Sequence, residues 1–492
     1  MPENRSAEAR ERAQAQMALI RTEFRGYIQE GPPPTDEHRG IHYFVRAGFV
    51  LVRDEYADRA RALLARAAEV EEEWLRDRET RRTEEGDAGE DPNLPRDGDL
   101  AYGIQWVQLP TLLNVFQALE ALRTGFWRGR SLLVFADVPT PVPAEAEHLL
   151  HVVDTASGCP ADEPLPVPPG TPPEPSPTHC RDAGRGIRVL VLDTGFDTRP
   201  TTLPWMLGVA GDQDPGIVPP DGATPATTQI ERYAGHGTFI AGVVRTMAPE
   251  AEVVVRAGLT TQLYAPGQGP GGAQPPHNTH ATIFEGQLAK ALERYLAEDD
   301  PDVISVSAGT RTESPRGLTL LNAFHEEVLR RHKGVVIVAA AGNDGQRSHF
   351  WPAASPWTVS VGALGYDWRS RADFSNFGSW VDVYAPGERL VNAFPRGQYR
   401  CTEPPNSNQI RLFEGMALWS GTSFSTPVVA GLIAARMSRT GENGPTAAGA
   451  LLAQAREHAI AGVGAVLTPG RHGSDRCRDQ PRERHGCDCD RD

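Results

Sequence analysis

Lysine is almost missing from this chain of 492 residues, where Lys290 and Lys333 are the only two lysines among 49 basic residues. We read that bias as genomic composition and draw no function from it. Acidic residues also outnumber basic ones, since 64 acidic against 49 basic residues give a formal net charge of −15. Such an acidic chain is poorly suited to nucleic acid or to an anionic membrane surface, so we predict neither as a partner.

Long hydrophobic runs and a targeting signal are missing as well. No stretch of the sequence approaches the ~18 apolar residues that a membrane-spanning helix needs. Residues 1–10 are charged and lack the apolar core of a secretory signal. None of the six cysteines lies in the motifs described below, which suits reduced thiols in a cytosolic setting. We therefore expect a cytoplasmic protein that makes no use of a membrane.

The most informative segment is Gly-Thr-Ser-Phe-Ser-Thr-Pro at 421–427, which is followed by the apolar stretch 428–435. Small residues before Ser423 and a helix after it would place the hydroxyl at a helix N-terminus. Free backbone N–H groups and the helix dipole favour a developing oxyanion there. Pro427 fits, because proline is tolerated in the first turn of a helix. A Gly-Thr-Ser tripeptide alone also occurs in ordinary turns, so the interpretation depends on other motifs.

Two such motifs lie upstream. Residues 186–195 read as a buried parallel strand that ends in Asp193, at the edge where open α/β sheets usually build their sites. His236 lies between glycines at the start of another apolar helix, and glycines let substrate and catalytic partners approach the imidazole closely. Singly, the two residues are equally compatible with a capping aspartate and a histidine in a tight loop. Together with Ser423 they occur in the order Asp, His, Ser that is associated with subtilisin.

A fourth motif is the continuous apolar strand 334–344, which runs into a Gly-Asn turn. Asn343 is either a turn residue that tolerates unusual backbone angles or a donor to an oxyanion. With all four motifs in this order, the chain resembles the subtilisin family of serine peptidases (subtilases). The resemblance covers about residues 184–465, and its further landmarks are 302–309, 351–363, 374–378 and 381–387.

This resemblance implies a fold and an activity. The fold is a three-layer α/β arrangement with a mostly parallel central sheet. The activity is that of a serine endopeptidase that forms an acyl-enzyme with polypeptide substrate, through Asp193, His236 and Ser423 as triad and Asn343 as oxyanion donor. No cofactor is required for this chemistry. The rival hypothesis is a catalytically idle peptide-binding module on the same fold.

The resemblance also assigns residues to substrate binding. Ser307, Ala308 and Gly309 would pair with an extended peptide as an added strand, which favours unfolded segments over helices. Phe350 stands where the family places the floor of the primary specificity pocket, often a small residue. The ring would either fill that pocket and select small substrate side chains or swing aside.

The composition, with 39% hydrophobic and 23% charged residues, is that of a globular protein, and the length suggests about three units. Within 40–140 the pattern strand-helix-strand-helix-strand, ending in a strand over 131–138, is compatible with a ferredoxin-like layer. The predicted units are a helical N-terminal extension (1–39), a small α/β domain (40–140), a Pro-rich linker (141–183), a peptidase domain (184–465) and a disordered Cys-, Arg- and Asp-rich tail (466–492).

Two interpretations of the small domain compete. It is either an inhibitory or folding-assisting prosegment, as in secreted subtilases, or a permanent regulatory domain that receives an activating partner. In both cases the Pro-rich linker is a favoured place for self-cleavage.

Two weaker signals concern metals. Asp212, Asp214 and Asp221 lie in one loop, and the resemblance makes a structural calcium ion conceivable, but their spacing matches no dedicated calcium loop. The tail carries soft ligands without the paired spacing of a zinc finger, so we predict disorder there and no metal. These tail residues are His472, Cys477, His485, Cys487 and Cys489.

Overall fold

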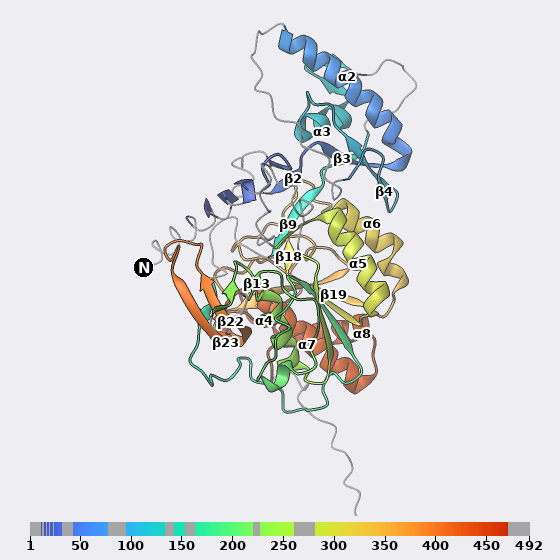
Figure 1. Cartoon of the computed structure of the whole chain (residues 1–492). Helices are drawn as coiled ribbons and strands as arrows, with labels where there is room; N and C mark the ends of the chain where they lie inside the picture. Colours follow the sequence, from blue (N-terminus) through green and yellow to red (C-terminus); the bar gives the residue numbers. More distant parts are fainter. Residues whose placement is uncertain are drawn as a thin grey trace, which may run out of the picture.

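The computed structural model describes residues 24–31, 43–76, 95–132, 142–152, 163–219, 227–259 and 281–470, together with part of 11–22. A large unit is built on a seven-stranded sheet, and a small unit sits above it in the view of Figure 1. A sheet of five strands joins the two units. Among the helices of the described residues, none has the length and apolarity that crossing a membrane requires.

The large unit is organised by a sheet in which all neighbouring strands run parallel. Its central strands are almost fully buried, as expected where helices cover both faces of a parallel sheet. The strands lie in the order β12 (Ala210–Gly211), β15 (Glu252–Ala257), β11 (Arg188–Asp193), β17 (Val303–Val306), β19 (Val336–Ala340), β20 (Thr358–Leu364) and β21 (Val383–Pro386).

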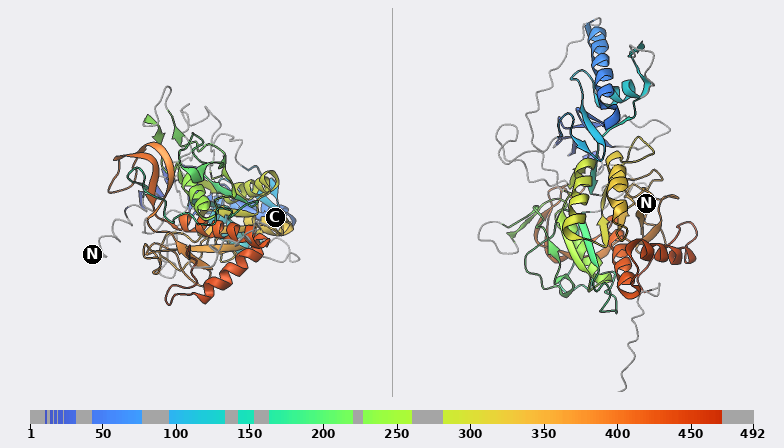
Figure 2. Two further views of the ribbon diagram at one scale, coloured as in Figure 1. Left: turned by 90° about the horizontal axis from the view of Figure 1, so that it is seen from below. Right: turned by 90° about the vertical axis from the view of Figure 1, so that its right-hand side faces the viewer.

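Successive side chains of each strand point to opposite faces of the sheet, and helices cover both faces (Figure 2). Val189 and Val191 of β11 pack on one face, and Leu190 and Leu192 pack on the other. The large unit therefore has the three-layer α/β fold with a mostly parallel sheet that the sequence predicts. The first face carries α4 (His236–Met247), α7 (Thr422–Thr440) and α8 (Gly444–Glu457), and the second carries α5 (Glu285–Asp299) and α6 (Thr319–Glu327).

The small unit is an antiparallel sheet in the order β4-β5-β3-β8, with two helices packed on it. In chain order, this sheet and its helices follow the succession β-α-β-β-α-β of a ferredoxin-like layer, with a separate two-stranded sheet of β6 (Phe126–Trp127) and β7 (Arg130–Ser131) inserted between α3 and β8. The unit extends past residue 140, because β8 completes the sheet. Most of the strand predicted over 131–138 lies outside the described residues. The elements are β3 (Phe49–Arg53), α2 (Ala57–Arg76), β4 (Leu100–Ala101), β5 (Ile104–Gln108), α3 (Val115–Thr124) and β8 (Ala144–Glu145).

The joining sheet contains strands from both units. Residues 28–30, which lie in the predicted helical extension, form a strand instead, because their backbone pairs with the strand at 44–46. The central strand of this sheet, β9, lies within the predicted linker. The order is β1 (Ile28–Glu30), β2 (Phe44–Arg46), β9 (His148–Val152) and β16 (Thr282–Phe284), and β18 (Ala308–Gly309) also pairs with β9.

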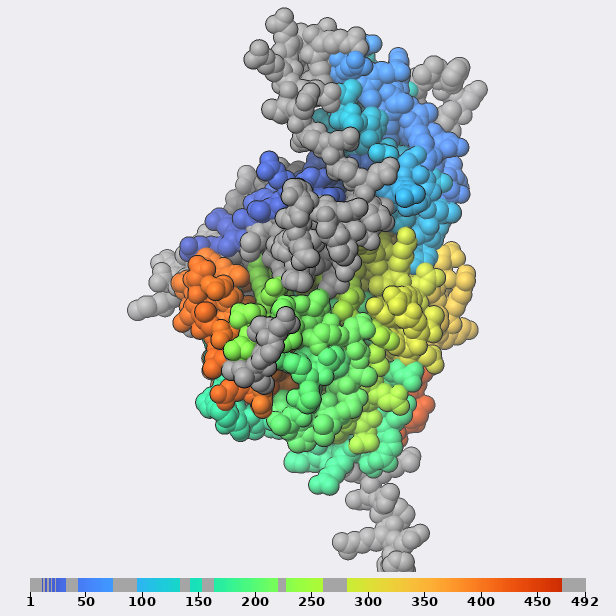
Figure 3. Space-filling view, in the orientation of Figure 1, coloured from blue at the N-terminus to red at the C-terminus, as the bar shows by residue number. Residues whose placement is uncertain are grey.

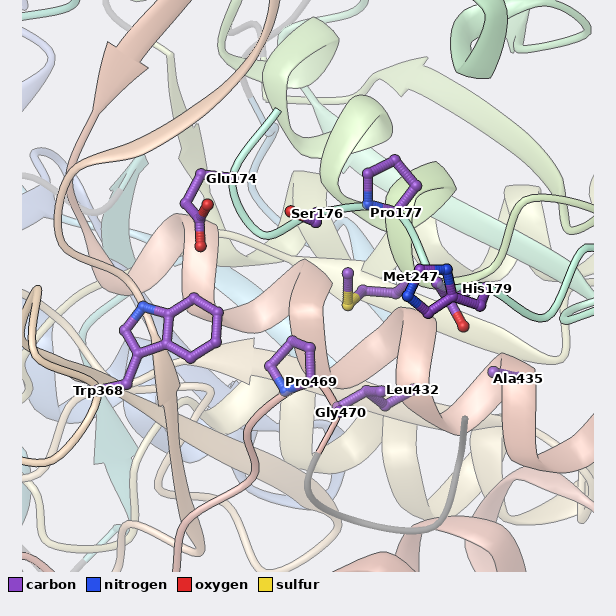
Figure 4. A pocket seen from close by; sticks show the side chains of 11 residues that line it. Glu174, Ser176, Pro177, His179, Met247, Trp368, Leu432, Ala435, Pro469 and Gly470 are labelled. Carbon is purple, nitrogen blue, oxygen red and sulfur yellow. The ribbon is translucent and has the colours of Figure 1, made fainter. Parts of the chain in front are cut away.

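The rest of the predicted linker, from residue 163, packs on the large unit. Strand β10 (Leu165–Pro166) pairs with the edge of a second sheet of that unit. Figure 4 shows Glu174 beside a pocket that Met247, at the end of α4, and Leu432, in the middle of α7, also line. Partial burial in this place raises the pKa of Glu174. The second sheet lies in the order β10, β23 (Ile410–Trp419), β22 (Leu390–Arg400), β14 (Gln229–Ile230) and β13 (Ile217–Val218).

The small unit contacts the large one beside α5 and α6, where Figure 3 shows the two surfaces meeting. Leu51, Ile104 and Trp106 form a buried apolar cluster with Leu320 of α6. Tyr102 adds a hydrogen bond of 2.7 Å from its hydroxyl to Glu293 of α5. The contact is therefore apolar at its centre and polar at its margin.

Candidate active site

Asp193 and His236 meet in the interior of the large unit. Asp193 is the last residue of β11 and His236 is the first of α4, and both side chains are buried. The Nδ1 atom of His236 lies 2.8 and 2.9 Å from the two carboxylate oxygens of Asp193. Glycines make this approach possible, since a Cβ atom on Gly237 would lie 2.2 Å from the carbonyl oxygen of Gly195.

The imidazole of His236 rests against aromatic rings. Its centroid lies 5.5 Å from Trp419 and 5.3 Å from Phe424, the residue after Ser423. Phe239, one turn further along α4, packs on Phe424 at 4.5 Å. These rings keep water away from one side of the histidine and hold it near the start of α7.

Ser423 is the second residue of α7 and is buried, as the motif predicts for a helix N-terminus. Within the described part of the chain its Oγ atom makes no hydrogen bond. Hydrogen bonds to a catalytic hydroxyl are often long until substrate is bound, so this geometry is compatible with a nucleophile.

Pro427 lies in the second turn of α7, not in the first turn that we predicted. It has no N–H group, so the carbonyl of Ser423, four residues earlier, receives no helical hydrogen bond from it. The hydroxyl of Ser307 donates to that carbonyl instead, at 3.1 Å. Because of the proline, the carbonyl oxygen of Ser423 can accept this bond from Ser307, which links Ser423 to the segment predicted to bind substrate.

Asn343 follows β19 and is fully buried. Its Oδ1 atom accepts hydrogen bonds from the backbone N–H and from the hydroxyl of Thr422, both at 2.9 Å. The orientation of the amide is thereby set, with Nδ2 on the side of Gly421, where an added Cβ atom would lie 3.5 Å from it. The amide nitrogen of Asn343, a hydrogen-bond donor, thus lies beside Gly421, two residues before Ser423.

Ala308 and Gly309, predicted to pair with substrate, already pair with a strand of this chain. Val152 of β9 lies opposite Ala308, and His151 lies opposite Gly309, in antiparallel register. On its other side β9 pairs antiparallel with β16. Strand β9 is therefore the middle strand between the two edges that border the candidate site.

Phe350 is 2% exposed and has not swung aside. A Cβ atom on Gly309 would lie 2.2 Å from its ring, and one on Gly342 would lie 3.0 Å from it. The ring therefore fills the space between the edge at Gly309 and the turn before Asn343. Arg311, two residues after Gly309, forms a buried ion pair of 2.8 Å with Asp344, the residue after Asn343. The sequence motifs did not predict this ion pair.

The aspartates considered for calcium bind groups of the protein instead. Asp212 accepts from Arg256 at 3.0 Å and from the N–H of Ala257 at 3.1 Å. Asp214 accepts three hydrogen bonds, described below, and Asp221 lies outside the described residues. The two carboxylates are thus not directed at a common point, and the described residues contain no cluster of three or more metal-binding side chains. We derive no step through a metal ion.

The cysteines differ from the expectation of reduced thiols. Cys180 is disulfide-bonded. Cys401 is a free, buried thiol, and burial raises its pKa to about 11. The cytoplasmic location stays a prediction, and the disulfide does not favour it. Residues 471–492, with the soft ligands of the tail, also lie outside the described part.

Comparison with known proteins agrees with the fold. The profile of the Subtilase family matches residues 184–468, more than half of the chain. The chain therefore belongs to the subtilase family.

Relatives match over this same region. The chain is 29% identical over 267 residues to an intracellular serine protease of Paenibacillus polymyxa, covering 51% of this chain and 66% of that protein. It is 32% identical over 209 residues to a thermophilic serine proteinase of Bacillus sp. (strain AK1), covering 42% and 43%. The match thus spans less than two thirds of either relative. Among solved structures, a mutant of the protease domain of PatA has a TM-score of 0.41 at 25% identity, covering 56% of this chain and 90% of that one.

Proposed function

We propose that this subtilase is a serine endopeptidase whose triad is Asp193, His236 and Ser423. The buried contact between His236 and Asp193, next to the helix that carries Ser423, is the observation that carries the proposal. A carboxylate that accepts from Nδ1 leaves Nε2 as the basic nitrogen of the imidazole. That nitrogen would take the proton of the serine hydroxyl as the oxygen attacks the scissile carbonyl.

The remaining steps follow from the same residues. Asp193 orients the ring and stabilises the imidazolium without being protonated itself. Asn343 and the backbone N–H of Ser423 stabilise the oxyanion of the tetrahedral intermediate. Collapse of this intermediate expels the amine, which takes its proton from His236, and leaves an acyl group on Ser423. Water, deprotonated by His236, then hydrolyses the acyl-enzyme.

Labelling with a fluorophosphonate distinguishes this proposal from an idle peptide-binding module. Such probes phosphonylate only a serine whose hydroxyl is activated. We expect the intact mass of the purified chain to rise by one probe, with the adduct on Ser423. A chain that binds extended peptides and never takes up the probe would be an idle module.

We also propose that the small unit holds the peptidase in a self-blocked state. Strand β9 takes the position of an added strand between β16 and β18. Its C-terminal end, Val152, pairs with Ala308, which follows Ser307, the residue bonded to the carbonyl of Ser423. Strand β9 therefore runs antiparallel to β18, and its last residue is the one nearest to Ser307, in the arrangement of an added substrate strand.

Buried polar contacts support the same proposal by fixing β9 at its start. Glu147, directly before β9, forms an ion pair of 2.5 Å with Arg46, and the two side chains are 1% and 3% exposed. The same carboxylate accepts from Nε1 of Trp106 at 2.7 Å and from the N–H of Gly286, at the start of α5, at 3.3 Å. Breaking a buried pair of this kind is costly, so the blocking strand is firmly held.

Replacing Asn343 with alanine should reduce kcat by about 10²–10³, with little change in KM. The reason is that its amide would bind the oxyanion and not the ground-state substrate. Steady-state kinetics on a peptide, with active enzyme counted by probe uptake, measure the effect. Thr422→Ser is the control, because serine retains the hydroxyl that donates to Asn343. Equal kcat in Asn343→Ala and the unchanged chain would mean that another group holds the oxyanion.

Phe350 should restrict cleavage to bonds that follow small side chains, because its ring fills the space beside Gly309. Replacing Phe350 with glycine should open that space and shift the preference toward large apolar residues. The expected gain in kcat/KM is about 10–200-fold for each methylene group that the enlarged pocket accommodates. Profiling of a peptide library measures both. His349→Ala, at the exposed neighbouring position, should leave the preference unchanged. A strong preference of the unchanged chain for aromatic residues before the cut would contradict this role.

A further inference from the structure

Asp214 is a buried carboxylate that contacts both loops of the candidate triad. Its Oδ2 atom accepts a hydrogen bond of 2.8 Å from the hydroxyl of Thr194, the residue after Asp193. The same oxygen accepts a second bond of 2.8 Å from the N–H of Gly235, the residue before His236. Asp214 is 2% exposed, so no water shields these contacts.

The loop of Asp214 is itself tied to these segments. Its Oδ1 atom accepts from the N–H of Gly216 at 2.9 Å, which fixes the orientation of the carboxylate. Its own N–H donates to the carbonyl of Phe196 at 2.9 Å. A Cβ atom on Gly195 would lie 2.9 Å from the backbone of Asp214, so the two loops touch with no side chain between them. Small movements of this carboxylate are therefore passed to both loops.

We infer that Asp214 is a positioning residue for the proposed reaction, which sets the placement of His236 relative to Asp193. It does not touch the reacting atoms and acts through Thr194 and Gly235. The inference rests on the proposed peptidase function and adds to it a residue that lies outside the three sequence motifs of the triad.

Protonation of Asp214 should weaken this arrangement. Burial, aided by the charge of Asp193, raises its pKa to about 7, and the hydrogen bonds from Gly235, Thr194 and Gly216 act in the opposite direction. A protonated carboxyl has a donor of its own and can accept fewer bonds. Activity should then fall as the pH drops through this range. The charged or titratable residues on the surrounding segments are Asp193, Asp197, Asp212, Glu231, Arg232 and His236.

Two variants and one control test the inference by kinetics. Asp214→Ala should lower kcat by about 10²-fold with KM nearly unchanged, the scale expected for a misplaced catalytic group. The acid limb of kcat/KM should be steeper in the unchanged chain than in Asp214→Asn, because Asp214 takes up a proton in this pH range and asparagine cannot. Asp212→Asn removes an equal charge from the same loop, and its kcat and pH profile should match those of the unchanged chain. A lower Tm of Asp214→Ala with unaltered kcat and pH profile would reduce Asp214 to a structural residue.

A second measurement does not depend on peptidase activity. In the Ser423→Ala background, the NMR signal of the Nδ1–H proton of His236 reports its hydrogen bond to Asp193. Asp214→Asn should shift this signal, because the segments before His236 and after Asp193 lose their shared acceptor, while Asp212→Asn should leave it in place. An unchanged signal in Asp214→Asn would overturn the inference. Failure of a chain with β9 displaced, such as Leu150→Arg, to take up the probe or to cleave peptide would instead overturn the peptidase proposal, with the NMR comparison still able to decide the role of Asp214.

Discussion

Replacing Ser423 with alanine should abolish peptide cleavage, with a loss in kcat on the order of 10⁶, the size known for the nucleophile of subtilisin. The loss is large because alanine removes the atom that forms the acyl-enzyme, and the remaining groups cannot replace covalent catalysis. Peptide hydrolysis and fluorophosphonate uptake of the purified chain measure it. Both should fall to background.

Ser425→Ala is a close control for this variant. Ser425 lies two residues further along α7, and its hydroxyl is also buried without a hydrogen bond to any described residue. The motif alone does not distinguish the two serines, whereas the aromatic contacts of His236 place the ring beside Phe424, between them. Loss of probe uptake in Ser425→Ala with full uptake in Ser423→Ala would transfer the nucleophile to Ser425.

Displacing β9 should raise the activity of the full chain by about 10³. A strand tethered beside the edges that bind it has an effective concentration of about 1 mM. If its intrinsic Kd for those edges is about 1 μM, the site is blocked about 10³ times as often as it is open, and displacement removes that factor. Leu150→Arg should displace the strand, because Leu150 is fully buried and cannot keep a guanidinium without a partner. The rate of probe uptake and the hydrolysis of an added peptide measure the release.

His151→Arg is the matched control, since His151 is the next residue of β9 and its side chain is only partly buried. Its activity should match that of the unchanged chain. Circular dichroism and Tm establish that each variant is folded. Equal probe uptake in Leu150→Arg and His151→Arg, both folded, would show that β9 does not block the site.

Intact mass of the same samples decides between the two interpretations of the small unit. Self-cleavage between Val152 and Glu163 that requires Ser423 would make it a prosegment. Probe uptake by an uncleaved chain would make it a permanent regulatory domain. The pairing of β9 accommodates both, because a strand can be held before and after its end is cut.

Much of the large unit could be predicted from local patterns. Continuous apolar runs followed by small or polar residues identify strands such as β11 and β19, because a parallel sheet buries both faces of each strand. Asp193 directly follows its apolar run, and Asn343 follows its run after Gly342, so their places near the end of a strand could be read from the sequence. In the structure His236 contacts Asp193, and the catalytic role of the pair is a proposal.

Other features could not be predicted locally. Within the helical extension expected over residues 1–39, residues 28–30 form β1, because their backbone pairs with residues 44–46. The linker expected from residue 141 contains β9, since two open strand edges more than a hundred residues further on can receive it. Local propensity does not report such partners. Asp214 illustrates the same limit, because the residues around an aspartate in a loop do not indicate which distant hydrogen-bond donors, here Thr194 and Gly235, its carboxylate will contact.

The sequence by itself determined the order of the catalytic motifs, the strands and helices that carry them, and the family to which the chain belongs. These depend on periodicity, on glycines and on residue type at a strand or helix end, all of which are local properties. Only the tertiary structure decided that Phe350 is buried beside Gly309, that β9 pairs with β16 and β18, and that Asp214 joins the segments of Thr194 and Gly235. Each of these depends on which backbone and side-chain groups from distant segments become neighbours, and burial then makes those contacts strong because water no longer competes for them.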